Sequence, residues 1–285
     1  MASRAQRFDP RQIMYRENFE IFHYREPKPA NVEVHHHDFY EVYLLLEGCV
    51  EYWVEGTLYK LDPGDIFLIS PMKLHRPVVD PQSKYERIVL WINKDFLETL
   101  SKEGFDLTAC FNSDGSRASL IRPSNTQYAS ISLHLLELTR EYNSKEFGNE
   151  LAAHGILLQF MVELNRIANK ETSLPSQKKR GSKLVGQVLS YINEHGNETL
   201  SLDDIAAHFY VSKYYLSHEF SRETGVGVYR YIMMKRLLLA KQLLADGTPA
   251  GVVCFRCGFK DYTSFYRAFK SEYGISPKVF AGTQE

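Results

Sequence analysis

The fold is decided by the stretch from Leu200 to Pro277. It begins LSLDDIAAHFYVSKYYLSHEFSRETG (residues 200–225), and its later part contains GFKDYTSFYRAFKSEYG (residues 258–274). Ser201 followed by Asp204 has the spacing of a capping box, which marks the start of a short helix. Ser212 and Asp261 each have the position of an N-cap before a second helix. The stretch therefore predicts two helix-turn-helix units.

The two units match in their spacing. Five positions of the first unit recur in the second with successive spacings of 4, 3, 2 and 6 residues: Leu216, Phe220, Glu223, Gly225 and Tyr231 against Phe265, Phe269, Glu272, Gly274 and Phe280. Five matches in register indicate two copies of one supersecondary unit. Residues 231–244 predict a connecting helix, which ends at Asp246-Gly247.

These motifs resemble the AraC/XylS family of bacterial transcription regulators. The residues that carry the resemblance are Tyr231, Ile232, Arg236, Ala240, Leu243, Leu244, Gly258, Phe259, Asp261, Phe265, Arg267, Phe269, Lys270, Gly274, Ser276 and Pro277. The resemblance implies an AraC-type DNA-binding domain, which we expect over residues 184–285. It also implies a dimeric regulator that responds to a small molecule, with a carbohydrate favoured. Double-stranded DNA and RNA polymerase are the macromolecular partners expected of an activator.

The outward positions of the second helix in each unit are the candidates for DNA contact. They follow from placing Leu216, Phe220, Phe265 and Phe269 in the core, and they are Lys213, Tyr214, Ser217, His218, Tyr262, Thr263, Tyr266 and Arg267. Arg267 is the best single candidate, because a guanidinium can pair bidentately with guanine. A phosphate contact or an ion pair is the alternative role of Arg267.

Composition supports a soluble protein of two domains. The chain has 285 residues and a net charge of −1, but residues 175–285 hold 15 Lys and Arg against 10 Asp and Glu. The C-terminal part is therefore basic, as expected of a domain that meets phosphates. No apolar run approaches the ~18 residues of a membrane span, and no signal peptide is present, so we expect a cytoplasmic protein without membrane contact.

Short strands dominate the N-terminal part. Strands are predicted at residues 41–46, 50–54, 57–61, 66–69 and 87–92, separated by turns such as Asp62-Pro63-Gly64-Asp65. Short, closely spaced strands favour a small antiparallel barrel or jelly roll, which we expect to be cupin-like and to span residues 32–123. Residues 1–31 are expected to form an N-terminal arm, since they hold scattered arginines and Pro27-Lys28-Pro29.

Two helices are expected to follow the barrel. Residues 124–142 and 150–167 carry apolar side chains at helical spacing, and we assign residues 124–169 to a helical region. The helices are expected either to pack on the barrel or to form the dimer contact that the resemblance implies, and both can hold. The polar segment 170–183 is expected to be the linker. The fold class is thus α+β multidomain, with an all-α C-terminal domain.

A group of polar and aromatic residues in the barrel is the candidate ligand site. His35, His37 and Glu41 have the parity that places strand side chains on one face, and their spacing is similar to the first cupin motif. His75 could join them. Tyr43, Trp53 and Trp91 could offer flat apolar faces to a sugar ring. We favour an effector pocket formed by these seven residues over a metal site, and a metal site over a packed barrel without ligand.

The metal alternative has a partial motif behind it. His35, His37, Glu41 and His75 would suit iron, zinc or nickel, but the second half departs from the cupin metal pattern, with Lys73 in the place of a glycine. We therefore expect no metal and no cofactor. The rival function is a metal-dependent cupin enzyme, an isomerase or dioxygenase, fused to a DNA-binding domain. A third alternative is an architectural DNA-binding protein without an effector.

No catalytic motif supports an enzyme. The chain lacks a Ser/His/Asp nucleophile motif, a Walker loop and a dinucleotide fingerprint. Cys254 and Cys257 are expected to be buried thiols rather than zinc ligands, because no second Cys or His pair is near in sequence.

Overall fold

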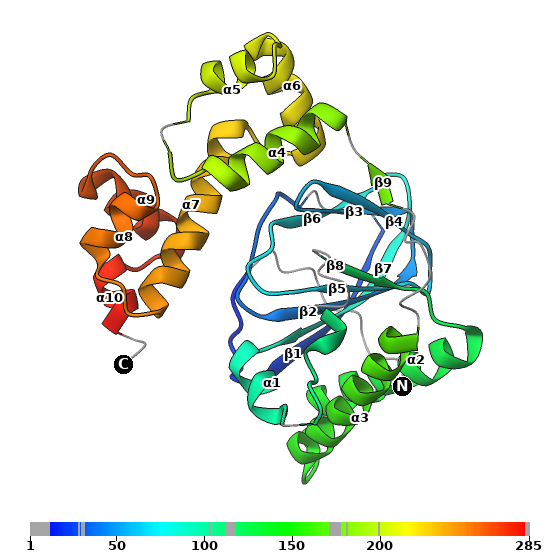
Figure 1. The fold of residues 1–285 in the computed structure, drawn as a ribbon. Coiled ribbons are helices and arrows are strands. Elements are labelled where there is room, and N and C mark those ends of the chain that lie inside the picture. Colours follow the sequence, from blue (N-terminus) through cyan, green and yellow to red (C-terminus); the bar gives the residue numbers. More distant parts are fainter. Residues whose placement is uncertain are drawn as a thin grey trace. The chain divides into compact units, whose positions relative to one another are not determined.

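The chain divides into two units, Met1–Lys179 and Arg180–Glu285. The computed structural model describes residues 12–27, 29, 32–102, 104–111, 118–170, 178–180, 182–198 and 200–282. The first unit is a β-sheet domain followed by two helices, and the second, beyond a short strand at the boundary (Lys178–Arg180), is all-helical in its described part (Figure 1). The predicted fold class is confirmed. The exact domain boundaries expected from the sequence remain predictions.

The first unit contains two sheets. Its strands are β1 (Phe19–Glu26), β2 (Tyr40–Glu47), β3 (Val50–Val54), β4 (Thr57–Leu61), β5 (Ile66–Ile69), β6 (His75–Val79), β7 (Tyr85–Ile92), β8 (Ala118–Ile121) and β9 (Lys178–Arg180). One sheet has the order β1-β7-β2-β5-β8 and the other β6-β3-β4-β9. Neighbouring strands such as β2 and β7 pair antiparallel, with Tyr43 opposite Val89.

Alternation along the strands divides the side chains between two cores. On β2, Val42 and Leu44 belong to the core that the helices share, whereas Tyr43 and Leu45 belong to the core between the sheets. This division follows from the two-residue period of a strand. The interior between the sheets also holds Tyr52 and other side chains of β3 and β4, so the candidate ligand residues point into a largely filled space.

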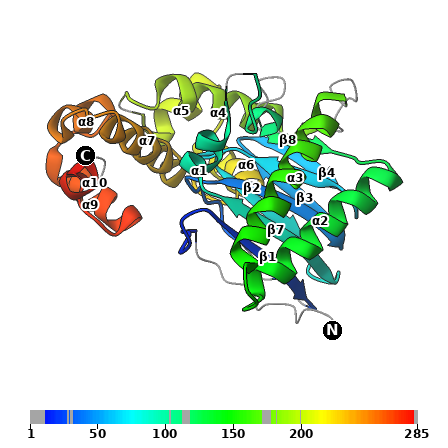
Figure 2. The ribbon, with the colours of Figure 1, turned by 90° about the horizontal axis from the view of Figure 1, so that it is seen from below.

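The helices of the first unit cover the five-stranded sheet. They are α1 (Lys94–Leu100), the short 3₁₀ helix η1 (Ala109–Phe111), α2 (Asn125–Asn143) and α3 (Asn149–Lys170). Helix α2 begins with a capping box formed by Ser124 and Gln127. Side chains of α2 and α3 share one core with the sheet, and Figure 2 shows both helices lying across its strands. The two predicted helices are confirmed.

The expected N-terminal arm is wrong for residues 19–26. They form β1, which pairs with β7 from Phe19 opposite Ile92 to Glu26 opposite Tyr85. Phe19 and Ile21 pack into one core and Phe22 and Tyr24 into the other. The apolar residues alternate as a strand requires, but charged neighbours and the Pro-Lys-Pro segment obscured that pattern. Residues 1–11 of the arm lie outside the described part.

The second unit consists of seven helices in its described residues. They are α4 (Lys183–His195), α5 (Leu202–His208), α6 (Lys213–Thr224), α7 (Val228–Ala245), α8 (Ala250–Arg256), α9 (Tyr262–Tyr273) and α10 (Pro277–Gly282). Ser201, Ser212 and Asp261 cap α5, α6 and α9 as predicted. Figure 1 shows α7 between the α5–α6 pair and the α8–α9 pair.

Two further expectations concern the whole chain. Cys254 and Cys257 are fully buried free thiols, as predicted. None of the helices in the described residues has both the length and the apolar character needed to cross a membrane.

Candidate functional site

Helices α6 and α9 present the same division into a buried and an exposed face. Leu216 and Phe220 are fully buried on α6, and Phe265 and Phe269 are fully buried on α9. The glycines that follow both helices, Gly225 and Gly274, are left-handed C-caps with φ of 82° and 75°. The repeat found in the sequence therefore corresponds to two helices that start, pack and stop in the same way.

The structure places most of the predicted DNA-contact residues on the exposed faces. Exposed side chains are Lys213, Tyr214, His218, Tyr262, Thr263, Tyr266 and Arg267, and Ser217 is half-buried. Tyr214 is 78% exposed, although its large apolar ring would ordinarily be buried in a folded domain. An exposed aromatic beside polar groups is a feature of surfaces that bind another molecule.

Electrostatic partners distinguish the candidates. The Nζ of Lys213 lies 3.1 Å from Asp203 of α5, and the Nδ1 of His218 lies 3.8 Å from Glu219. Among the described residues, Arg267 makes no hydrogen bond or ion pair, so its guanidinium is available to a ligand. Hydrogen bonds from Ser264 lower the pKa of the exposed Asp261, and the charge of Arg267 adds to this effect. An interaction with Asp261 therefore stays the alternative role of Arg267.

The repeated glutamates, Glu223 and Glu272, connect helices within the second unit instead of facing a ligand. Glu223 accepts a hydrogen bond from the backbone N–H of Ser182, the N-cap of α4. Glu272 forms an ion pair of 2.9 Å with Arg230 of α7. Arg236, another residue of the family pattern, donates to the carbonyl oxygen of Gly196 at 2.7 Å and to that of Glu198 at 2.6 Å. Part of the sequence signature is therefore structural.

Two exposed tyrosines escaped the sequence reasoning. Tyr210 lies in the turn between α5 and α6 with a φ of 54°, and it is 96% exposed. Tyr215, the neighbour of Tyr214, is also exposed. Of the tripeptide Tyr210-Val211-Ser212, the sequence identifies only Ser212, as an N-cap. The unusual backbone angle that turns Tyr210 outward has no signal in the sequence.

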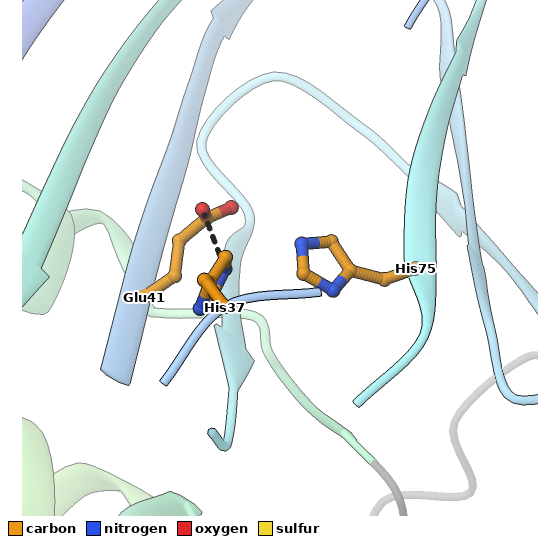
Figure 3. A group of neighbouring side chains, drawn as sticks. All are labelled: His37, Glu41 and His75. Carbon is orange, nitrogen blue, oxygen red and sulfur yellow. Dashed lines mark ion pairs between the residues drawn. The ribbon is translucent and has the colours of Figure 1, made fainter. Parts of the chain in front are cut away.

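In the first unit, three histidines and one glutamate lie close together. The backbones of His35 and His75 form an isolated antiparallel bridge, with hydrogen bonds of 3.1 and 3.0 Å. Their rings are 4.3 Å apart between centroids, and the ring of His37 is 4.7 Å from that of His75. Figure 3 shows His37, Glu41 and His75 from three segments of chain around one space. The predicted histidine and glutamate candidates are thus neighbours.

Glu41 is the polar centre of this group. Its Oε1 accepts a hydrogen bond from the hydroxyl of Tyr52, and its Oε2 accepts one from the Nε1 of Trp91, both at 3.0 Å. The Nε2 of His37 lies 3.3 Å from Oε2. Burial alone would raise the pKa of Glu41, but the hydrogen-bonding contact with His37 and the electrostatic interactions with His37, His75 and His35 outweigh it and give a pKa of about 2. Glu41 is therefore a buried carboxylate at neutral pH.

Burial acts in the opposite direction on the imidazoles. It lowers the pKa of His35 to about 4 and that of His75 well below its usual value. Both rings are accordingly neutral at physiological pH, each with one nitrogen lone pair that can accept a hydrogen bond or bind a cation.

Tyr43 and Trp91 face the same interior, but Trp53 does not. A small cavity of about 40 Å³ is lined by residues that include His35, Glu41, Tyr43 and Trp91. The neighbouring strand residue Tyr52 also lines it, so strand alternation turns Trp53 to the opposite face of β3. The structure therefore brings six of the seven predicted effector residues to one region and separates Trp53 from them.

Sequence reasoning missed four polar residues that line this interior from the strands. They come from β1, β3 and β7, and are Tyr24, Tyr52, Tyr85 and Arg87. Tyr43 donates a hydrogen bond to the hydroxyl of Tyr85 at 2.8 Å, and Arg87 pairs with Glu26 at 2.6 Å. Tyr52 could have been found, since it shares the parity of Val50 and Val54 on a predicted strand. Tyr24 lay in the expected arm.

A larger hollow of about 630 Å³ lies away from this cavity. Its lining comes from α2 and α3 and includes Leu158, Val162, His134 and Glu163. The Nδ1 of His134 is 3.1 Å from Glu163. Leu133, Leu136, Leu158 and Val162 are exposed on these two helices. The helices thus pack on the barrel on one side and leave apolar side chains uncovered on another.

Comparison with known families matches both units. Residues 18–161 match the family described as AraC-like ligand binding domain, and residues 205–282 match the family described as helix-turn-helix domain. The first match covers half of the chain and includes the histidines, Glu41, α2 and part of α3.

Known proteins of similar length align along most of the chain. The HTH-type transcriptional activator RhaS of Klebsiella pneumoniae strain 342 is 24% identical over 262 residues, covering 89% of this chain and 88% of the relative. RhaS of Escherichia coli O81 strain ED1a is 24% identical over 260 residues, with 87% of each chain covered. A solved structure, the C-terminal domain of AraT from Geobacillus stearothermophilus, is 29% identical with a TM-score of 0.36, covering 37% of this chain and 88% of that one.

Proposed function

The chain belongs to the AraC family of transcription regulators, and we propose that it is an activator whose DNA binding responds to a small molecule held in the barrel. Its helix-turn-helix domain binds DNA and its N-terminal unit is a ligand-binding domain. The activator assignment is supported by the RhaS relatives, which are named as transcriptional activators. Recruitment of RNA polymerase is the corresponding mechanism.

The observation that carries the proposal is the paired design of α6 and α9. Each helix buries an aromatic face and exposes polar side chains at its N-terminal end, where a recognition helix meets base edges in the major groove. We propose that Tyr214 and His218 of α6 and Arg267 of α9 contact DNA, together with the other outward residues of both helices. Two such helices would read two successive major-groove segments.

Selection of binding sites from a random pool of duplexes tests this proposal. The full-length protein should enrich a motif with two half-sites whose centres are about one helical turn apart. A pool that shows no enriched motif, or one half-site only, would contradict the paired reading. The same selection with an Arg267→Ala variant should leave the half-site of α6 recognisable and degrade that of α9.

The effector is proposed to bind among Glu41, Tyr43, Trp91 and the histidines. Family resemblance favours a carbohydrate, and buried hydroxyl, imidazole and carboxylate groups can hydrogen-bond to its hydroxyls. The cavity of about 40 Å³ is well below the several hundred Å³ that an organic ligand occupies. Binding of a sugar would therefore require the two sheets or their connecting loops to move apart, and that movement is the proposed source of the regulatory signal.

We also propose that the active form is a homodimer formed through α2 and α3. Support comes from the exposed leucines on these helices and from the hollow beside Leu158 and Val162. The AraC family is typically non-enzymatic, so we do not propose the cupin enzyme for this chain.

A further inference from the structure

Three buried donor groups lie within reach of a single ion. One ligand atom from each of His37, Glu41 and His75 lies within 4.8 Å of the other two. These residues are 3%, 5% and 0% exposed, respectively. Figure 3 shows that they come from the segment before β2, from β2 and from β6, and that their polar ends are directed toward one another.

The protonation of both imidazoles is set by the backbone. The Nδ1 of His37 donates to the carbonyl oxygen of Phe39 at 2.9 Å, and the Nδ1 of His75 donates to that of Lys73 at 2.7 Å. A neutral histidine that donates from Nδ1 carries its lone pair on Nε2. A hydrogen bond of this kind also fixes the orientation of metal-binding histidines in many proteins.

The two Nε2 atoms lack a donor that would satisfy them. Both are buried, and neither has a hydrogen-bond partner among the described residues. The Nε2 of His37 faces the Oε2 of Glu41 at 3.3 Å, and when Nδ1 holds the only ring proton this places a lone pair against a carboxylate oxygen. Two acceptors at that distance repel each other unless a cation lies between them. A proton could satisfy His37, but it would leave the Nε2 of His75 without a partner.

We propose that the barrel binds one divalent first-row transition-metal ion through the Nε2 atoms of His37 and His75 and the carboxylate of Glu41. Two imidazoles and one carboxylate are suitable ligands for iron(II), zinc or nickel. The three donor atoms now lie within 4.8 Å of one another. Metal–ligand bonds of about 2.0–2.2 Å require them to come somewhat closer, and rotation of the side chains can bring them together. Glu41 and His35 also line the neighbouring cavity of about 40 Å³, which has room for a water molecule beside the ion.

This site deepens the proposed function, because it lies in the region assigned to the effector. Three protein ligands leave coordination positions open, and oxygen atoms of a water or of the effector would fill them. The ring of His35, next to that of His75, lies at the edge of the site.

Metal titration of the full-length protein tests the inference. The protein is purified without a histidine tag, stripped with EDTA and titrated calorimetrically with Ni²⁺ and with Zn²⁺. One ion should bind per chain. Because loss of a supporting hydrogen bond already costs 10–100-fold in affinity, the ligand variants His75→Gln and Glu41→Gln should each weaken binding by at least about 100-fold. The matched control His36→Gln changes the neighbouring histidine and should bind as the parent does.

A second measurement does not depend on the variants folding. Co²⁺ added to the unaltered protein should produce visible absorption bands typical of nitrogen and oxygen ligands, and Zn²⁺ should remove them. The inference is overturned if the folded protein does not bind one ion per chain. It is also overturned if folded His75→Gln protein binds the ion with the same affinity as the unaltered protein.

The same preparation separates this inference from the proposed function. If the protein enriches a duplex motif but binds no metal ion, only the metal site is overturned. Metal binding without any duplex selection overturns the proposed function alone.

Discussion

Arg267 is the residue on which the DNA-binding proposal can be tested most directly. Its guanidinium is exposed on α9 and free of ion pairs within the described residues. A bidentate contact with guanine is worth about 1–3 kcal/mol of specific binding. We therefore expect Arg267→Ala to weaken binding to the selected duplex by that amount in a gel-shift titration, with little change on a scrambled duplex.

Arg267→Lys is the matched control for charge. Lysine keeps the positive charge but lacks the planar fork of donors, so it should retain non-specific binding and lose part of the specific binding. Equal affinity of both variants and the parent for the selected duplex would assign Arg267 no role in recognition.

Gly258 is expected to tolerate no side chain. Its φ is +78°, and a Cβ there would lie 2.5 Å from the backbone oxygen of Asn197. Gly247 has a similar φ of +79° with no atom within 4 Å. The left-handed conformation costs an alanine about 1–2 kcal/mol at either position, and the close approach should add about 1–3 kcal/mol at Gly258 only.

Urea denaturation of the two glycine variants measures this difference. Gly258→Ala should lower the free energy of unfolding clearly more than Gly247→Ala. If Gly258→Ala and Gly247→Ala lower the free energy of unfolding by similar amounts, the segment around Asn197 moves aside without cost.

Parity predicted the site residues only in part. His35, His37 and Glu41 lie close together, but only Glu41 is on a strand, so the strand parity that predicted the group is not its cause. The same rule cannot say which face of a strand is the interior. Trp53 was chosen as an aromatic candidate, but its neighbour Tyr52 faces the cavity. His75 was placed by resemblance, and only the bridge to His35 explains its position.

At the scale of the element, α6 separates stability from recognition. Leu216 is fully buried and Tyr214 is 78% exposed two residues away. Leu216→Ala should lower the free energy of unfolding by about 2–5 kcal/mol, because it leaves a cavity in the core. Tyr214→Ala should change it by less than about 0.5 kcal/mol but should weaken specific DNA binding. The assignment of a buried and an exposed face to α6 would be contradicted if Tyr214→Ala destabilised the fold in denaturation measurements and Leu216→Ala did not.

Helices α2 and α3 carry the dimer prediction. A carboxylate at Leu158, beside the exposed Val162, should place charge in an apolar contact. We expect Leu158→Asp to be monomeric in light scattering at concentrations where the parent is dimeric. Leu151→Asp, at an exposed position of α3 outside the hollow, is the control. A dimer that persists in Leu158→Asp protein would place the interface elsewhere.

Elements bounded by clear turns were among those predicted from the sequence. Strands β3, β4 and β5 match their expected residues because glycine and proline turns limit them. Strand β6 contains Pro77, which argues against a central strand, but β6 lies at the edge of its sheet, where proline is tolerated. The caps of α5, α6 and α9 were predicted correctly because capping depends on local sequence.

At the scale of the whole molecule, the division into two units predicts independent DNA binding. The second unit, Arg180–Glu285, has its own core around Phe265, Phe269 and Leu244. We expect a fragment of these residues to fold and to enrich the same duplex motif as the full chain, without any small molecule. A fragment that folds, as judged by circular dichroism, but selects no motif would show that recognition requires the first unit.

The connecting helix α7 has a consequence for the promoter. Its 18 residues extend about 27 Å, a fixed length between the two reading helices. Insertion of about five base pairs between the half-sites would turn one of them to the far side of the duplex, since a helical turn takes about 10–10.5 base pairs. Insertion of a full turn would restore the angular phase but would double the separation. Neither promoter should therefore support activation.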